Sequence, residues 1–186
     1  MEYHNPVLLK ETVGGLNIKQ DGVYVDVTFG GGGHSKEILE SLGSNGRLIA
    51  FDQDKDALLN VIDDPRFLLI SENFRFMQRF LRFHGVKAVD GILADFGVSS
   101  HQFDEPERGF SIRFDAMLDM RMNQQDVLSA HSLVNNYEEE ALRQVFWQYG
   151  ELRAAPVLAK TIVQARQIAS IDTTFDLKTV LKKHLP

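Results

Sequence analysis

The sequence contains no cysteine, and this absence removes several classes of protein from consideration. Disulfide-bonded scaffolds and cysteine-based zinc or iron–sulfur sites are excluded. No segment approaches the ~20 consecutive apolar residues that a membrane-spanning helix needs. The N-terminus carries Glu2 instead of a basic segment, and no long apolar run follows it, which disfavours a signal peptide. We therefore expect a cytoplasmic protein that does not enter the membrane.

An excess of positive charge is also missing. The 186 residues include 20 basic and 26 acidic side chains, so the formal net charge is −6. This balance argues against a protein that coats nucleic acid through bulk positive charge. It leaves room for an enzyme that meets RNA through one local patch of cations. Hydrophobic residues make up 44% of the chain, which is enough for a globular core.

Short apolar runs alternate with amphipathic segments over the first hundred residues. The pattern predicts four strands, at residues 23–27, 47–51, 67–70 and 88–94. It predicts three intervening helices, at residues 35–41, 54–62 and within 73–84. Strand–helix alternation with short loops is typical of a parallel sheet with right-handed crossovers. We expect the strand order 3-2-1-4.

The remainder of the chain follows a different pattern. A polar segment, residues 104–109, is followed by sequence in which no strand is convincing. Helices are predicted at residues 136–149 with Asn136 as N-cap, from 154 or 155 to 169, and at 175–184. We therefore expect a Rossmann-like α/β domain at 1–103 and an inserted all-helical domain at 104–186. Because α/β domains of this kind usually have five to seven strands, we expect the chain to be the N-terminal part of a longer protein.

The strongest local signal is a run of four glycines, Gly30 to Gly33, between the first predicted strand and the helix after it. Glycines there let the backbone approach a ligand and adopt positive φ angles. The start of the following helix offers free N–H groups to an anionic group. Asp52 ends the second strand, where dinucleotide-binding folds place a carboxylate that binds ribose hydroxyls.

This loop has three possible interpretations: a site for a nicotinamide dinucleotide, a site for S-adenosylmethionine, or a glycine-rich turn that binds no ligand. A nicotinamide dinucleotide is disfavoured because Ser35 stands where a third glycine is expected. S-adenosylmethionine is favoured, because an acid at the strand end (Asp26), a small residue (Thr28) and spaced glycines suit a cationic ligand. A third carboxylate, Asp95, ends the fourth strand and precedes a Gly-Val-Ser-Ser loop. The same edge of a parallel sheet should collect all three acids.

The helix predicted within residues 73–84 carries two sets of side chains. Phe76, Phe80 and Phe83 share helical spacing, and three arginines, Arg75, Arg79 and Arg82, have the same spacing one residue earlier. The favoured interpretation is an ordinary amphipathic helix, with phenylalanine inward and arginine solvated. The alternative is an arginine stripe that contacts phosphate.

Taken together, the motifs resemble those of the bacterial S-adenosylmethionine-dependent methyltransferases known as RsmH or MraW, which methylate N4 of a cytidine in small-subunit ribosomal RNA. The matching segments include His4, Pro6 and Glu11, residues 26–35, Phe51-Asp52-x-Asp54, Asn73-Phe74, residues 95–102, 106–111, 118–122 and 149–151. The chain departs from the family pattern at Ala116-Met117, Asn123, residues 124–131 and Leu152, where RNA is expected to meet the protein.

The resemblance implies a class I methyltransferase fold with a helical insertion, and it implies both the ligand and the partner. The implied donor contacts are Gly32, Gly33, His34, Asp52, Phe74, Asp95 and Gln102. Asp95 is also the candidate catalytic group, and no metal is expected. The implied partner is the small ribosomal subunit or its RNA; a homodimer is left open. The alternatives are a methyltransferase of a small molecule or DNA amine, and a non-catalytic fragment that binds the donor or RNA.

Overall fold

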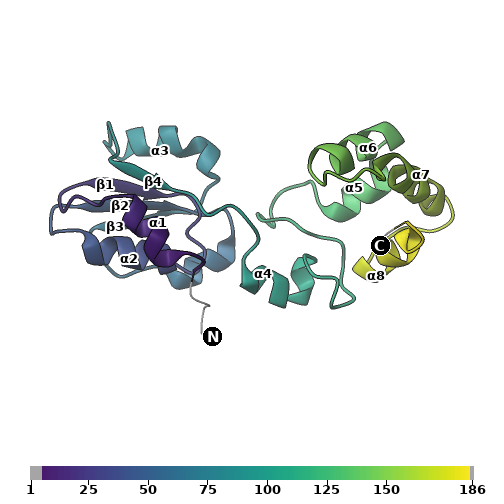
Figure 1. The fold of residues 1–186 in the computed structure, drawn as a ribbon, viewed down its shortest axis with the longest axis horizontal. Helices are drawn as coiled ribbons and strands as arrows, with labels where there is room; N and C mark the ends of the chain where they lie inside the picture. The colour runs from purple at the N-terminus through teal and green to yellow at the C-terminus, as the bar shows by residue number, and fades with distance from the viewer. Residues whose placement is uncertain (1–5, 185–186) are drawn as a thin grey trace. The chain divides into compact units, whose positions relative to one another are not determined.

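The computed structural model describes residues 6–184 and is drawn in Figure 1. The chain divides into two compact units. The first comprises residues 1–97 with 122–124, and the second comprises residues 98–121 with 125–186. Each unit has its own hydrophobic core and is described separately.

The first unit is built on a four-stranded parallel sheet. Its strands are β1 (Val23–Asp26), β2 (Arg47–Phe51), β3 (Phe67–Ile70) and β4 (Gly91–Leu93). The order β3-β2-β1-β4 confirms the sequence prediction. β4 is shorter than the predicted strand at 88–94. Just before β4, the Asp90 carboxylate accepts a hydrogen bond from the N–H of Val23 at 2.9 Å. A side chain therefore replaces the backbone carbonyl that would accept this bond in a continuing strand.

Helices cover both faces of this sheet. α1 (Leu9–Gly15) and α2 (Gly33–Ser41) lie on one face, and α3 (Met77–Phe83) lies on the other (Figure 1). Alternating strand residues supply the two cores, as the two-residue period of a strand requires. Tyr24 and Leu48 belong to the core on the α2 side, and Val25 and Ile49 to the core that includes α3 residues. The sequence reading missed α1, which has only seven residues.

The helix predicted at 54–62 is instead a 3-10 segment, η1 (Lys55–Asn60). The Asp54 side chain accepts the N–H of Asp56 at its start. A second 3-10 turn, η2 (Phe74–Phe76), precedes α3. Both short segments follow strand ends, so they shape the edge of the sheet where loops meet.

The prediction that Phe76, Phe80 and Phe83 all point inward was wrong. Phe80 packs beside the core with Met77 and buried Leu81, whereas Phe83 is 81% exposed and Phe76 is also exposed. At 100° per residue, Met77 and Leu81 lie on one side of Phe80 around the helix, and Phe83 lies on the other. The inward face is therefore centred away from Phe83.

The second unit is helical where it has regular structure. Its elements are α4 (Ser100–Asp104), η3 (Pro106–Arg108), α5 (Ala130–Asn136), α6 (Glu139–Gln148), α7 (Ala155–Arg166) and α8 (Thr174–Leu181). Leu142, Leu158, Ile162 and Ile171 lie at the centre of its core. Between residues 98 and 184 the structure has no strand, only an isolated bridge between Met117 and Thr173. Residues 109–129 form neither helix nor strand, so this part is less helical than predicted.

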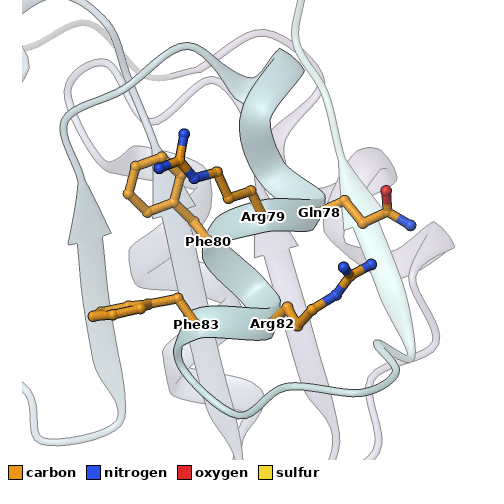
Figure 2. Close-up of a pocket in the computed structure, with 5 residues that line it drawn as sticks. All are labelled: Gln78, Arg79, Phe80, Arg82 and Phe83. Atoms are coloured by element: carbon orange, nitrogen blue, oxygen red, sulfur yellow. The ribbon is translucent and has the colours of Figure 1, made fainter.

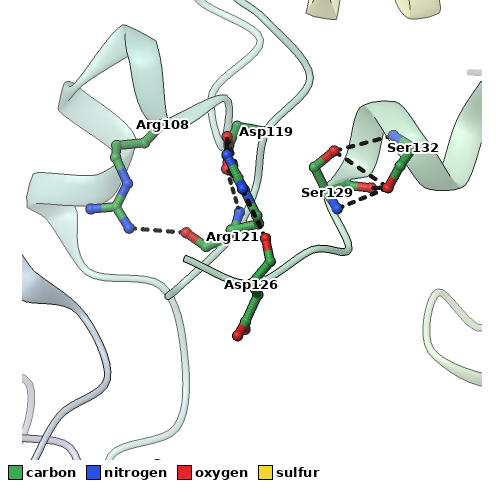
Figure 3. Close-up of polar contacts among 6 residues, drawn as sticks. All are labelled: Arg108, Asp119, Arg121, Asp126, Ser129 and Ser132. Carbon is green, nitrogen blue, oxygen red and sulfur yellow. Dashed lines mark hydrogen bonds and ion pairs between the residues drawn. The ribbon is translucent and has the colours of Figure 1, made fainter. Parts of the chain in front are cut away.

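The sequence prediction that Asn136 caps the start of a helix was wrong. It is the last residue of α5, and α6 begins only at Glu139. α5 starts at a capping box in which Ser129 and Ser132 exchange hydrogen bonds (Figure 3). It ends where Arg166 donates to the carbonyl oxygens of Val134 and Tyr137. Pro156 lies in the first turn of α7, and the Thr173 side chain caps the start of α8. No described helix is long and apolar enough to cross a membrane.

Candidate functional site

The loops that follow β1, β2 and β4 leave the same edge of the sheet, because parallel strands end on one side. In open α/β sheets this is the edge where ligands bind. The candidate site is therefore defined by the glycine loop after β1, by Asp52 after β2, by Phe74 after β3 and by Asp95 after β4.

The glycine loop has the backbone that its sequence predicts. Gly30 (φ 52°) and Gly32 (φ 77°) both lie in the left-handed region that favours glycine. The carbonyl oxygen of Gly30 accepts a hydrogen bond from the Asn60 amide at 3.2 Å, a contact with η1 that sequence reasoning missed. α2 begins immediately after Gly32, so the N–H groups of its first turn, from Gly33 to Ser35, lack helical acceptors. These donors suit a carboxylate.

Gly33 has a packing role that the sequence could not show. A Cβ atom at this position would lie 2.2 Å from Cγ of Pro6, a ring that cannot turn aside. Pro6 belongs to the N-terminal segment, far from the glycine run in the sequence. Glycine is thus required here because the Pro6 ring packs against the Gly33 backbone, independently of any ligand.

Asp52 ties the second strand to the glycine loop. One carboxylate oxygen accepts the Gly30 N–H at 2.7 Å, and the other accepts the Asp54 N–H at 2.9 Å. Burial raises the pKa of Asp52, and the two backbone donors oppose that rise. An ionised carboxylate has about four acceptor positions, so each oxygen keeps capacity for one more donor, such as a ribose hydroxyl.

Asp26 does not face a ligand as the sequence analysis expected. Its side chain is 0% exposed. One oxygen accepts the Ser35 hydroxyl at 2.7 Å and the other accepts the Thr28 N–H at 3.0 Å. Burial raises its pKa, and these two hydrogen bonds oppose the rise. Asp26 therefore fixes the start of α2 to the end of β1.

Thr28 links this buried group to the candidate catalytic residue. Its hydroxyl oxygen accepts the N–H of Asp95 at 2.8 Å, which holds the end of β4 beside the loop after β1. The Asp95 side chain is exposed, and its carboxylate has no partner among residues 6–184. It is therefore available to accept a hydrogen bond from a substrate.

Two aromatic rings form an apolar wall at the same edge. Phe74 and Phe96 have ring centroids 5.6 Å apart with a 38° angle between planes. Phe74 is 39% exposed and Phe96 is 71% exposed, so both keep open ring surface. Sequence reasoning selected Phe74 and missed Phe96. The position of Phe96 directly after Asp95, the acid that ends the fourth predicted strand, is the sequence signal that could have identified it.

The two remaining predicted residues differ in their placement. His34 lies in the first turn of α2 and is buried, and its Nε2 atom has no hydrogen-bond partner among the described residues. Gln102 lies in the second unit. There its side-chain oxygen accepts the Ser99 N–H at 3.0 Å in the capping box of α4. Six of the seven predicted positions thus fall in the first unit, and all six lie in the loops or the helix start at the sheet edge.

Three arginines of the second unit, Arg108, Arg113 and Arg121, bind other residues of that unit. Arg121 chelates the Asp119 carboxylate and donates to the carbonyl of Asp126, while Arg108 donates to the carbonyl of Arg121 (Figure 3). Arg121 lowers the pKa of Asp119 through these hydrogen bonds. Arg113 pairs with Asp104 at 3.0 Å. These contacts stabilise an otherwise irregular segment.

A model of the MraW methylase family matches residues 1–186, the whole of the chain. The chain belongs to this family. Its four parallel strands and flanking helices agree with the Rossmann-like sheet that the motifs implied.

Similar curated proteins carry one name, ribosomal RNA small subunit methyltransferase H. The Flavobacterium johnsoniae protein is 72% identical over 186 residues, which cover 100% of this chain and 62% of that protein. The Christiangramia forsetii protein is 66% identical, over 98% of this chain and 60% of its own length. The Bacteroides thetaiotaomicron protein is 56% identical with the same two coverages. The chain therefore spans about three fifths of the length of these relatives.

Proposed function

We propose that the full-length protein transfers a methyl group from S-adenosylmethionine to N4 of a cytidine in small-subunit ribosomal RNA. The observation that carries the proposal is the linked sheet edge, in which Asp52 binds the Gly30 N–H and Thr28 binds the Asp95 N–H. The family match and the shared name of the relatives indicate the reaction class and the substrate. We propose the helical unit as the part that recognises RNA.

The first unit fits the methyl donor at three points. The first-turn N–H groups of α2 suit the amino-acid carboxylate, and Asp52 has acceptor capacity for the ribose diol. Phe74 and Phe96 offer apolar ring surface beside which adenine can pack. His34 Nε2 is a buried atom without a partner in the described chain, as expected of a group that a ligand completes. Gln102 remains a predicted donor contact.

The reaction needs alignment more than acid–base strength. The bound donor supplies an electrophilic methyl group on a sulfonium. The cytosine amine is a weak nucleophile, because its lone pair is conjugated with the ring. Asp95 would accept a hydrogen bond from this amine, which localises the lone pair and orients it for in-line attack. The N4–methyl bond would form as the methyl–sulfur bond breaks, which leaves the donor product as a neutral thioether. The N4 proton would pass to the exposed Asp95 carboxylate or to water.

The target base must leave any base pair to reach such an edge. We therefore propose that the substrate cytidine is single-stranded or flipped out of its stack. The tetrad after β4, Asp95-Phe96-Gly97-Val98, differs from the Asp/Asn-Pro-Pro-aromatic sequence common in DNA amine methyltransferases. The relatives' shared name also favours ribosomal RNA over a small molecule.

Radiolabelled methyl transfer by the full-length protein tests this function. Unmethylated small ribosomal subunits, transfer RNA and DNA would be offered separately with labelled S-adenosylmethionine. We expect label in the RNA of the small subunit alone. Label in transfer RNA or DNA, or in none of the three, would contradict the proposal.

A further inference from the structure

Positive charge is concentrated in one short segment of this acidic chain. Residues 73–89 contain four basic side chains and no acidic one, whereas the whole chain has a net charge of −6. The same segment contains four phenylalanines. It forms η2, α3 and the loop that leads towards β4.

Several of these side chains are exposed to solvent. Figure 2 shows an open pocket on α3 lined by Gln78, Arg79, Phe80, Arg82 and Phe83. Arg79 and Phe83 leave the helix on one side, and Arg82 leaves it on the other. Arg82 also lines a second pocket with Lys87. We call Arg79, Arg82, Phe83 and Lys87 the α3 basic surface.

The fold does not explain these side chains. Met77, Phe80 and Leu81 already fill the core beneath α3, and Phe83 is 81% exposed with its ring edge-to-face against His84, centroids 5.1 Å apart. Arg79, Arg82 and Lys87 have no hydrogen-bonding or ionic partner among the described residues. By contrast, Arg66, Arg121 and Arg143 all bind carboxylates. The cations of α3 are therefore free to bind an external anion.

Unpaired guanidinium groups beside an exposed aromatic ring match the chemistry of single-stranded nucleic acid. Arginine binds phosphate through bidentate hydrogen bonds, and a flat ring stacks on any base. The rest of the chain is net negative, with 16 basic and 26 acidic side chains, so this segment offers a polyanion a local concentration of positive charge. η2 begins with Phe74 at the proposed donor site, so α3 continues directly from that site along the sequence.

We propose that the α3 basic surface binds single-stranded RNA, with Arg79 and Arg82 on phosphates and Phe83 stacked on a base. This inference rests on the proposed function, because it assigns part of the RNA substrate to the α3 basic surface. Arginine and phenylalanine play separable parts, since phosphate contacts release counterions and stacking does not.

The test measures binding of the full-length protein to single-stranded small-subunit RNA over a series of potassium chloride concentrations. Arg79→Gln/Arg82→Gln should weaken binding about tenfold or more at low salt. It should also reduce the slope of log affinity against log salt by about 1.4, which is about 0.7 for each phosphate contact with a single strand. Phe83→Ala should weaken binding about fivefold or more and leave the slope unchanged.

The matched control is Arg47→Gln/Lys10→Gln, which removes the same charge from exposed positions on β2 and α1. It should keep nearly wild-type affinity and slope. Equal losses in the control and the α3 variant would overturn the inference, because the effect would then be one of net charge. Wild-type affinity in the α3 variants would overturn it as well.

Methyl transfer separates failure of this inference from failure of the proposed function. If the wild-type protein methylates small-subunit RNA while the α3 variants bind that RNA normally, only the inference fails. If the wild-type protein neither binds nor methylates this RNA, the proposed function fails too. A further outcome is that the protein binds vesicles of anionic phospholipid, and that the α3 substitutions abolish this binding without changing RNA binding. The α3 basic surface would then bind a membrane, which would contradict the proposal.

Discussion

The carboxylate of Asp52 accepts the backbone N–H of Gly30 at 2.7 Å, across 22 residues of sequence. This contact joins the end of β2 to the positive-φ turn that begins the glycine loop. The group proposed to bind the ribose therefore also holds the loop proposed to bind the carboxylate of the same ligand. Substitutions at Asp52 should affect the donor alone and leave the RNA surface intact.

Asp52→Ala should weaken S-adenosylmethionine binding by about 1.5–3 kcal/mol, the usual loss for hydrogen bonds to a charged group. Titration calorimetry on the full-length protein measures this directly. Asp63→Ala is the control, because Asp63 is an exposed acid after η1 and lies outside the candidate site. Equal donor affinity in wild type and Asp52→Ala would remove Asp52 from the donor site.

Donor affinity should also depend on pH through Asp52. Burial raises its pKa above the ordinary value of 3.8, and only the ionised form accepts two ribose hydroxyls fully. Affinity should therefore fall as the pH is lowered through this raised pKa, beginning at a higher pH than for an exposed aspartate. Calorimetry across mildly acidic pH values checks this. The Asp52→Asn variant should lack that fall, and an identical pH profile in both proteins would contradict the assignment.

Asp95→Asn should reduce kcat about a hundredfold or more, because an amide is a poorer acceptor for the attacking amine than a carboxylate. Stability should change little, because the Asp95 side chain is exposed. Single-turnover methyl transfer with saturating donor and RNA measures the step. A wild-type rate would show that Asp95 is not the catalytic group.

Thr28→Val tests whether Thr28 positions Asp95. The substitution keeps the shape of the side chain and removes the acceptor of the Asp95 N–H. Loss of this hydrogen bond should raise the activation free energy by about 1 kcal/mol, which lowers kcat about fivefold. Donor affinity should stay close to wild type. Thr179→Val, at an exposed position of α8, is the matched control. A purely structural role would instead lower the melting temperature without a separate effect on kcat.

Gly33→Ala should destabilise the first unit by about 1–3 kcal/mol, because its Cβ would overlap the Pro6 ring. Gly14→Ala in α1 is the contrasting control, since its Cβ meets nothing within 4 Å and alanine favours the helix. Denaturant unfolding of both variants measures the difference. Equal stability of the two variants would show that the Pro6 contact does not constrain Gly33.

The sequence predicted the sheet and its loops well because both depend on local patterns. β-branched and aromatic runs mark β1 to β3, and the glycines precede α2 as expected. The errors came from contacts that are distant in sequence. Asp26 is buried by packing and by Ser35, and Phe83 is exposed because the core centres on Met77 and Leu81.

The second unit was harder to predict for the same reason. Its helix ends depend on side chains from other helices, such as Arg166 on the carbonyls that end α5. The irregular stretch 109–129 is held by Arg108 and Arg121 through backbone carbonyls, which leave no periodic signal. Gln102 could be named from the resemblance, but its capping contact with Ser99 required the structure.

The central claim is most directly tested by identifying the methylated nucleoside itself. Small subunits lacking the modification would be incubated with the full-length protein and S-adenosylmethionine, and their RNA digested to nucleosides for mass spectrometry. The account predicts N4-methylcytidine with the wild-type protein, and little or none with Asp95→Asn over the same period. Methylation at another atom or another base, or equal yields from the two proteins, would contradict it.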